Sequence, residues 1–144
     1  DKGVVKVTSS SELCSHNVRN AVGIHNNNNF FCTEDSPNSW LKYDFIKQKV
    51  HPIGYSITLH KFHGNYPRSW VIEESNNDND WIVLDTRQNE TSLNGCNVTC
   101  KFDIKFQEGS YRYLRILQTG KNSSSYDYLV FSSLEFIGIL SDNE

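Results

Sequence analysis

The clearest local pattern in the chain is the run Ser69-Trp70-Val71-Ile72-Glu73-Glu74-Ser75-Asn76-Asn77-Asp78-Asn79-Asp80-Trp81-Ile82-Val83-Leu84. Side chains alternate in character over 70–73 and again over 81–84, and polar turn formers separate the two segments. Alternation on both sides of a polar turn predicts a β-hairpin. Trp70 and Trp81 flank the turn. Two indole rings would give the hairpin a large apolar contact area, provided that each N–H finds a partner.

The bulk composition fits one soluble β-rich domain. The chain has 144 residues, so we expect a single domain over 1–144. A chain of this length buries roughly 68–70% of its unfolded surface, which is enough for a core without disulfides. The net charge of -3 provides no basic footprint and argues against a nucleic-acid partner. No apolar run approaches the length of a membrane span, which argues against membrane insertion.

Alternating segments recur along the rest of the chain. They lie at 41–45, 53–59, 97–104, 111–118 and 128–140, with a weaker segment at 4–7. The last segment is long enough to need a bulge or bend, expected near Ser132-Ser133. Ser9-x-x-Glu12 has the spacing of a capping box and predicts at most a short helical turn. With no long helix, the pattern predicts an all-β fold, an antiparallel jelly-roll β-sandwich of about eight strands.

The connections between these strands fall into two groups. If successive strands alternate in direction, the short connections 47–52, 76–80 and 106–110 share one end of the sandwich. The longer ones, 17–39, 61–68, 87–95 and 119–127, share the other end. Long loops gathered on a rigid scaffold are where binding surfaces are usually built. The sequence therefore predicts a binding site at the long-loop end.

Several motifs resemble a known family. They are Trp40-Leu41-x-Tyr43-Asp44-Phe45, Ser69-Trp70-x-Ile72-Glu73-x-Ser75-Asn76-x-Asp78-x-x-Trp81, Arg112-Tyr113-x-Arg115-x-x-Gln118-Thr119-Gly120-Lys121-Asn122 and Leu134-Glu135-Phe136-x-Gly138. Together they resemble the discoidin domain, also called the coagulation factor V and VIII type C domain. The similarity is closest to the branch found as modules of intracellular multidomain proteins. It implies an eight-stranded, galactose-binding-domain-like jelly roll, in agreement with the strand count.

The chain also departs from that family. Extracellular members usually link their two ends by a disulfide, but Cys14 has no cysteine near the C-terminus to pair with. Glu74 and Asn79 stand where the family often has Gly. The first loop lacks the acidic Asp-Gly turn of many sugar-binding members. These departures weaken any transfer of calcium or sugar binding from the family.

The richest candidate loop is Lys61-Phe62-His63-Gly64-Asn65-Tyr66-Pro67-Arg68, with His60 just before it. Aromatic anchors together with Arg are what recognition surfaces favour. From this segment we predict six ligand-binding residues: His60, Lys61, Phe62, His63, Tyr66 and Arg68. The alternative is that Tyr66 and Pro67 only cover the end of the sandwich.

Two other loops supply candidates. Lys121, Asn122 and Tyr126 face the same end by parity and are predicted to add polar contacts. Phe30 and Phe31 follow an Asn run, and two adjacent aromatics in a loop cannot both easily point inward. We therefore predict Phe31 as a ligand contact, with the pair as exposed anchors or membrane-dipping spikes. Without a basic cluster nearby, a membrane role is disfavoured.

Metal binding and catalysis find little support in the sequence. His60 and His63 lack a fixed third ligand, and no calcium-loop ligand series surrounds Asp78. No nucleophile motif or phosphate-cradling Gly loop occurs. We therefore expect a non-enzyme without cofactor or metal.

The four cysteines bear on the compartment. They are Cys14, Cys32, Cys96 and Cys100. The last two share parity on one segment, so they should face the core, too far apart to bridge. We expect buried free thiols rather than disulfides, which favours a cytoplasmic over an extracellular location. Three N-glycosylation triplets, beginning at Asn89, Asn97 and Asn122, point the other way but carry little weight in an Asn-rich chain.

Two functions remain open after these exclusions. The first is a non-catalytic recognition module that binds a protein or peptide through the long-loop end. The alternative is a lectin-like module, in which Phe62 or Tyr66 stacks on a sugar ring and His, Asn and Arg side chains bind hydroxyls. The sequence favours the protein or peptide partner over the glycan.

Overall fold

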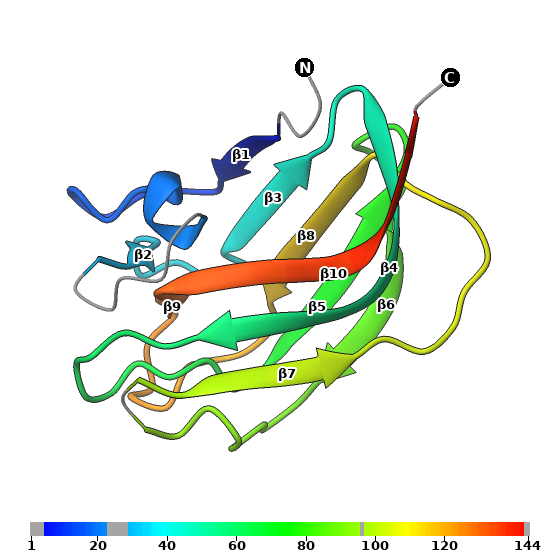
Figure 1. Cartoon of the computed structure of the whole chain (residues 1–144). Coiled ribbons are helices and arrows are strands. Elements are labelled where there is room, and N and C mark those ends of the chain that lie inside the picture. The colour runs from blue at the N-terminus through cyan, green and yellow to red at the C-terminus, as the bar shows by residue number, and fades with distance from the viewer. Residues whose placement is uncertain (1–4, 23–28, 96, 143–144) are drawn as a thin grey trace.

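The computed structural model describes residues 5–22, 29–95 and 97–142. Its elements are β1 (Lys6–Ser9), η1 (Val18–Ala21), β2 (Phe31–Cys32), β3 (Trp40–Asp44), β4 (Gln48–Thr58), β5 (Trp70–Ser75), β6 (Ile82–Arg87), β7 (Thr99–Asp103), β8 (Tyr113–Gln118), β9 (Val130–Phe131) and β10 (Ser133–Asp142). A five-stranded antiparallel sheet in the order β1-β3-β8-β5-β6 faces a three-stranded sheet in the order β10-β4-β7 (Figure 1). The two sheets together contain the eight strands that the sequence predicts, and the all-β fold is confirmed.

Alternation places one face of each strand in the core between the sheets. Leu41 of β3, Ile57 of β4, Ile72 of β5 and Ile116 of β8 are all fully buried there. The Tyr43 hydroxyl donates a 2.6 Å hydrogen bond to the Leu134 carbonyl, which ties β3 in one sheet to β10 in the other. Each buried aliphatic side chain stabilises the fold by roughly 1.5–3 kcal/mol.

The predicted hairpin is formed by β5 and β6, but its two tryptophans do not share an apolar contact. Trp70 is fully buried, and its indole N–H donates to the Tyr55 hydroxyl at 2.9 Å. Trp81 precedes β6 and packs under the Arg115 guanidinium, 3.9 Å from its ring centroid. The Arg115 side chain is 20% exposed and lies on the face of the sheet away from the core, so the two indoles lie on opposite faces of the sheet.

Three local predictions are corrected by the structure. β4 starts at Gln48 and runs through Pro52, which pairs with Gly138 of the edge strand β10 beside a register shift. β4 is the middle strand of this sheet, but β7 pairs with it only over Gly54–Thr58, so Pro52 has a paired strand on the β10 side alone. Proline, which has no N–H to donate, is tolerated where one side of a strand is unpaired. Glu12 does not form a box with Ser9; its carboxylate accepts from the Val18 N–H at the start of η1. The strand is interrupted at Ser132, between β9 and β10, as expected, whereas the bulge lies between Ile137 and Gly138.

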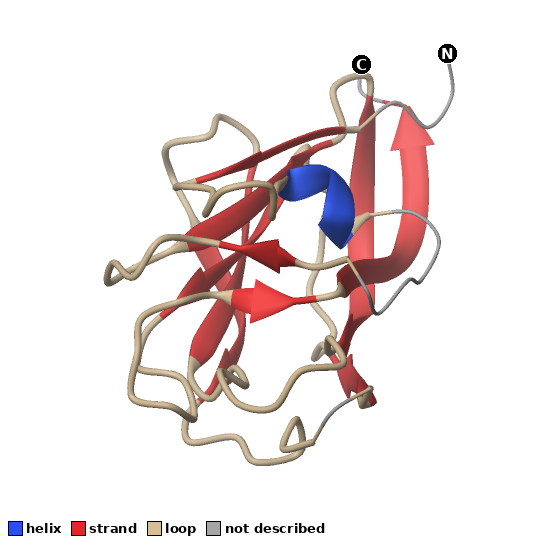
Figure 2. Ribbon diagram, turned by 90° about the vertical axis from the view of Figure 1, so that its left-hand side faces the viewer, coloured by secondary structure: helices blue, strands red, loops and turns tan. Residues whose placement is uncertain are grey.

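The four long connections meet at one end, as predicted. Ser123 N–H donates to the Tyr66 carbonyl, and Glu90 N–H donates to the Arg68 carbonyl. Asp127 N–H donates to the Asp35 carboxylate at 2.7 Å. Figure 2 looks on to this end, where the single helical turn and the loops gather. No helix among the described residues is long and apolar enough to cross a membrane.

Candidate ligand-binding site

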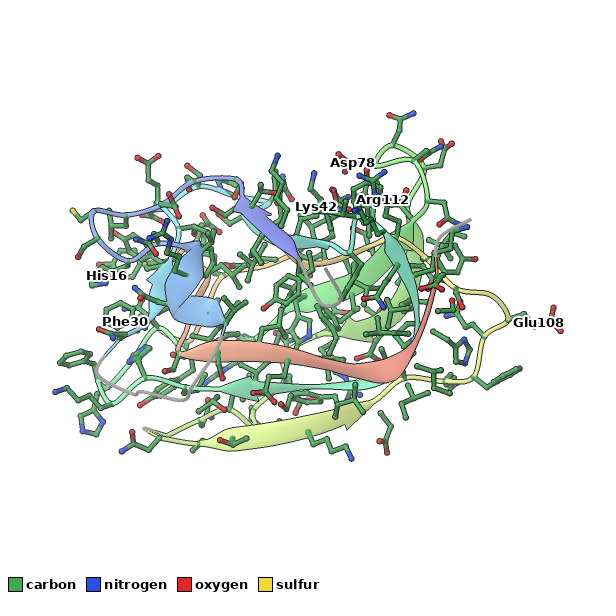
Figure 3. The ribbon with its side chains drawn as sticks, turned by 45° about the horizontal axis from the view of Figure 1, so that its top comes forward. His16, Phe30, Lys42, Asp78, Glu108 and Arg112 are labelled. Atoms are coloured by element: carbon green, nitrogen blue, oxygen red, sulfur yellow. The ribbon has the colours of Figure 1, made fainter. Side chains whose placement is uncertain are left out.

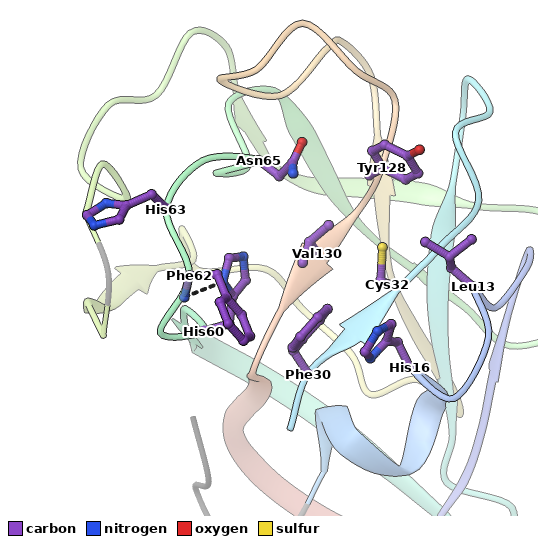
Figure 4. A pocket seen from close by; sticks show the side chains of 10 residues that line it. All are labelled: Leu13, His16, Phe30, Cys32, His60, Phe62, His63, Asn65, Tyr128 and Val130. Carbon is purple, nitrogen blue, oxygen red and sulfur yellow. Dashed lines mark hydrogen bonds between the residues drawn. The ribbon is translucent and has the colours of Figure 1, made fainter. Parts of the chain in front are cut away.

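A cavity of about 280 Å³ opens at the long-loop end (Figure 4). It lies between the segment before η1, the paired strands β2 and β9, and the loop that follows β4. The lining residues are Leu13, His16, Phe30, Cys32, His60, Phe62, His63, Asn65, Tyr128 and Val130. The described lining combines aromatic rings with imidazole and amide groups and contains no carboxylate.

Aromatic rings form a continuous wall of this cavity. His16 stacks on Phe30 with ring centroids 4.0 Å apart, and Phe62 meets Phe30 edge-on at 5.8 Å. Phe62 nevertheless keeps 49% of its surface exposed. A large apolar ring held half in water beside a cavity is typical of a recognition surface.

His60 is the most deeply placed polar group of the cavity. It is only 3% exposed, and its Nδ1 accepts a 3.1 Å hydrogen bond from the Phe62 N–H. Burial lowers the pKa of His60, so the neutral ring is favoured. With Nδ1 accepting, the neutral ring carries its proton on Nε2. No partner for Nε2 is found among the described residues, and the ring lines the cavity.

Asn122 holds two of the loops together beside the cavity. Its side-chain N–H groups donate to Asn65 Oδ1 and to the Tyr128 carbonyl, both at 3.1 Å. Its Oδ1 accepts from the backbone N–H groups of Ser124 and Tyr126. Because Oδ1 of Asn65 is engaged in this way, its amide N–H groups are left to face a ligand.

Three of the predicted binding residues line the cavity, namely His60, Phe62 and His63. Lys61 lies beside them, exposed, with its Nζ 5.3 Å from the Phe62 ring centroid. Their role in binding stays a prediction. The Lys61 ammonium lies over the Phe62 ring, and the Phe62 and Phe30 rings meet edge to face.

The other predicted residues lie outside the described cavity lining. Tyr66 packs against the core, and Arg68 donates to Asn94 at 3.2 Å. Lys121 pairs with Asp127 at 2.9 Å and borders a separate polar groove with Ser69. Asn122 is the buried anchor described above. Tyr126 is 48% exposed and packs on Tyr128, one ring away from the cavity.

The expectation of an exposed Phe31 is wrong. Phe31 is fully buried against Phe131, with centroids 5.5 Å apart, because β2 pairs with β9. It is Phe30, its neighbour, that faces the cavity (Figure 4). The sequence signal for the remaining lining residues is weak, since His16 and Tyr128 sit in irregular segments whose pairing is set by distant strands.

Metal and thiol chemistry follow from the same geometry. Within the described ranges no group of three or more His, Cys, Asp or Glu side chains is placed to hold a metal ion. Cys14, Cys32 and Cys100 are free thiols, as expected, but Cys14 is exposed rather than buried. Burial raises the pKa of Cys32 to about 12, so this thiol stays protonated in the cavity. Cys96 lies outside the described residues.

The family relationship is decided by a match over most of the chain. The family model described as the F5/8 type C domain, the discoidin domain, matches residues 6–130. The chain belongs to this family. It is also 27% identical over 111 residues to the E3 ubiquitin-protein ligase Ufd4 of Drosophila melanogaster. That match covers 74% of this chain and only 4% of the length of the ligase.

Solved structures share the fold at low sequence identity. A carbohydrate-binding module of Clostridium perfringens, solved with GalNAc-β-1,3-galactose, matches with TM-score 0.73 and 8% identity over 93% of this chain and 95% of that one. The NanJ family 32 module of the same organism, solved with galactose, gives 0.70 and 13% over 95% and 93%. The lectin domain of lectinolysin, solved with Lewis B antigen, gives 0.73 and 15% over 93% and 92%.

These structures correct the functional prediction. The sequence favoured a protein or peptide partner, whereas the similar solved domains are carbohydrate-binding modules and lectin domains whose bound ligands are sugars. The finding contradicts the favoured prediction and agrees better with the lectin-like alternative.

Proposed function

We propose that this domain binds carbohydrate, with a sugar ring held in the cavity between Phe30, Phe62 and His60. The observation that carries the proposal is the combination of an aromatic wall with an inward imidazole and an amide. A pyranose has a face of C–H groups and a rim of hydroxyls, so it needs both kinds of contact. The cavity, about 280 Å³, is of the size of small-ligand sites.

The polar groups suit a neutral sugar. His60 offers a donor at Nε2, and Asn65 offers its amide N–H groups after its oxygen is taken by Asn122. Both are held by other residues before any ligand arrives. Groups fixed in this way lose little entropy on binding, which improves affinity and selectivity.

We also propose that the chain is a single non-catalytic domain. Domains of this family generally act as binding modules. The absence of a nucleic-acid or membrane partner remains a prediction from charge and hydropathy.

A glycan array with a matched pair of variants tests the proposal. Phe62 and Phe106 are both exposed phenylalanines, 49% and 81%, at opposite ends of the sandwich. Phe62→Ala is expected to reduce affinity for the best array sugar about tenfold or more, because a stacking surface is lost. Phe106→Ala should leave affinity unchanged.

Thermal unfolding of both variants controls for the fold and should shift little, since both rings are exposed. Binding of the wild-type domain to no array sugar would overturn the proposal. Equal losses from Phe62→Ala and Phe106→Ala would overturn the choice of cavity.

A further inference from the structure

His60 makes two different contacts with its two ring nitrogens. Nδ1 accepts from the Phe62 N–H, which folds the chain back after β4 and sets the Phe62 ring beside Phe30. Nε2 is the other nitrogen of a ring that lines the cavity (Figure 4). One imidazole thus shapes the aromatic wall and supplies a donor to whatever the cavity holds.

A second proton would disrupt the first contact. It can be added only at Nδ1, since Nε2 already carries one. The Phe62 N–H would then face an N–H group in place of a lone pair. The hydrogen bond that holds the 60–62 turn would be lost, and the half-exposed Phe62 would then depend on its ring contacts with Phe30 and His60 and on the Lys61 cation.

The groups around His60 do not favour its charged form. Those that titrate are His16 before η1, Cys32 on β2, Tyr128 before β9, and Lys61 and His63 in the same loop. None of the described lining residues is a carboxylate, and the Cys32 thiol is protonated. Burial lowers the pKa of His60 in the same sense, so the neutral ring is the resting state near neutral pH.

We propose that His60 is a proton-controlled positioning residue: neutral, it holds Phe62 in the aromatic wall and donates Nε2–H to the ligand, and protonated, it releases Phe62 and weakens binding. The identity of the ligand rests on the proposed carbohydrate function, whereas the effect of His60 protonation on Phe62 does not. Affinity for a neutral sugar is expected to fall about tenfold on acidification from about pH 7.5 to about pH 5, because the bond from the Phe62 N–H to Nδ1 is lost and with it the contact of the Phe62 ring with the sugar.

Two substitutions separate the two nitrogens. In His60→Asn the amide oxygen lies near the position of Nδ1 and still accepts from Phe62, but no donor reaches the cavity. In His60→Gln the amide nitrogen lies near the position of Nε2 and still donates, but the Phe62 anchor is lost. Both variants should bind methyl β-galactoside more weakly than wild type at neutral pH and show no acid-dependent step. His51→Asn, at a partly buried histidine of the turn end, is the control and should keep both affinity and its pH dependence.

Nitrogen NMR of the free domain tests the switch without any sugar. The ¹⁵N spectrum of His60 should show a proton on Nε2 only near neutral pH, and the Phe62 amide signal should shift in step with His60 protonation. A proton on Nδ1 at neutral pH, or a Phe62 amide signal that does not shift as His60 is protonated, would overturn the inference. Wild-type protein that gives the expected NMR result but binds no sugar of the glycan array would instead count against the proposed function and leave the switch standing.

Discussion

The two ends of the sandwich are built from the same strands, but their polar side chains make different kinds of contact. At the turn end, charges pair with each other: Arg112 with Asp44 at 2.8 Å and Lys42 with Asp78 at 2.9 Å. Figure 3 labels Lys42, Asp78 and Arg112, which lie close together there.

At the loop end, Lys121 also pairs with Asp127 at 2.9 Å, but this pair lies outside the cavity lining. Beside the cavity the loops are joined by uncharged groups, such as the Asn122 amide with Asn65. The comparison supports the proposal that the loop end receives a ligand, while the turn end closes the sheets.

The largest expected effect is at the anchor of the loop end. Asn122→Ala removes four hydrogen bonds of a residue that is 5% exposed. We expect it to lower the free energy of unfolding by about 3 kcal/mol, because buried partners are left unpaired. Urea unfolding measures this change.

Asn76→Ala is the matched variant at the turn end. The exposed Asn76 accepts one bond, from the Arg112 N–H, so its loss should cost about 0.5–1 kcal/mol. Similar losses of unfolding free energy in Asn122→Ala and Asn76→Ala would mean that the polar networks of the two ends are equivalent, which would contradict the difference drawn between them.

A buried carboxyl near the turn end should make stability pH-dependent. Glu74 is 1% exposed, and its Oε1 has no partner among the described residues. Burial raises the pKa of Glu74 to about 7, despite a hydrogen bond from Tyr111. The folded chain therefore holds a proton that the unfolded chain releases, and the free energy of unfolding falls as pH rises from about 4.5 to about 7.

Glu74→Gln removes this dependence. We expect it to raise the free energy of unfolding by about 2 kcal/mol at pH near 9 and to change it little near pH 4, where both forms are neutral. Chemical unfolding at the two pH values measures the difference. A variant less stable at both values would show that the carboxyl is a needed partner.

The smallest effect concerns backbone strain in the β3–β4 turn. Ile46 has φ of 53°, a conformation that β-branched residues adopt only under strain. Ile46→Asn should stabilise the domain by about 0.5–1 kcal/mol, because Asn tolerates this region. Lys47→Asn, one residue on and absent from the positive-φ set, serves as the control and should not stabilise. A loss of stability in Ile46→Asn would mean that packing of the isoleucine outweighs the strain.

Alternation predicted the strands because it reports which face of each strand is buried. Leu41, Tyr43 and Ile72 were assigned in this way, and all three are buried. Pro52 misled the prediction: proline suggested a connection, yet β4 continues through it because β7 pairs with β4 only from Gly54 onward and leaves that side of Pro52 without a strand. Whether a stretch of strand has a neighbour on one side or on both depends on the whole sheet, so it cannot be predicted from the local sequence pattern.

The site was less predictable because its partners are distant in sequence. Phe30 and Phe31 look equivalent until β2 pairs with β9, about a hundred residues away, and buries one of them. Asn122 is a polar loop residue of a kind that often contacts ligands, but its hydrogen bonds to Asn65 and Tyr128 make it a structural anchor. The aromatic and histidine content of the 60–66 loop could be recognised directly, since loop composition is local.

The bonds among the long loops have a thermodynamic consequence. The loop carrying Tyr66 and the one carrying Ser123 are already joined in the empty domain by hydrogen bonds of 2.8 and 2.9 Å. A sugar would meet a framework that needs no large rearrangement beyond the short turn at His60. Calorimetry should then register a modest heat-capacity change, since little apolar area would be newly ordered on association.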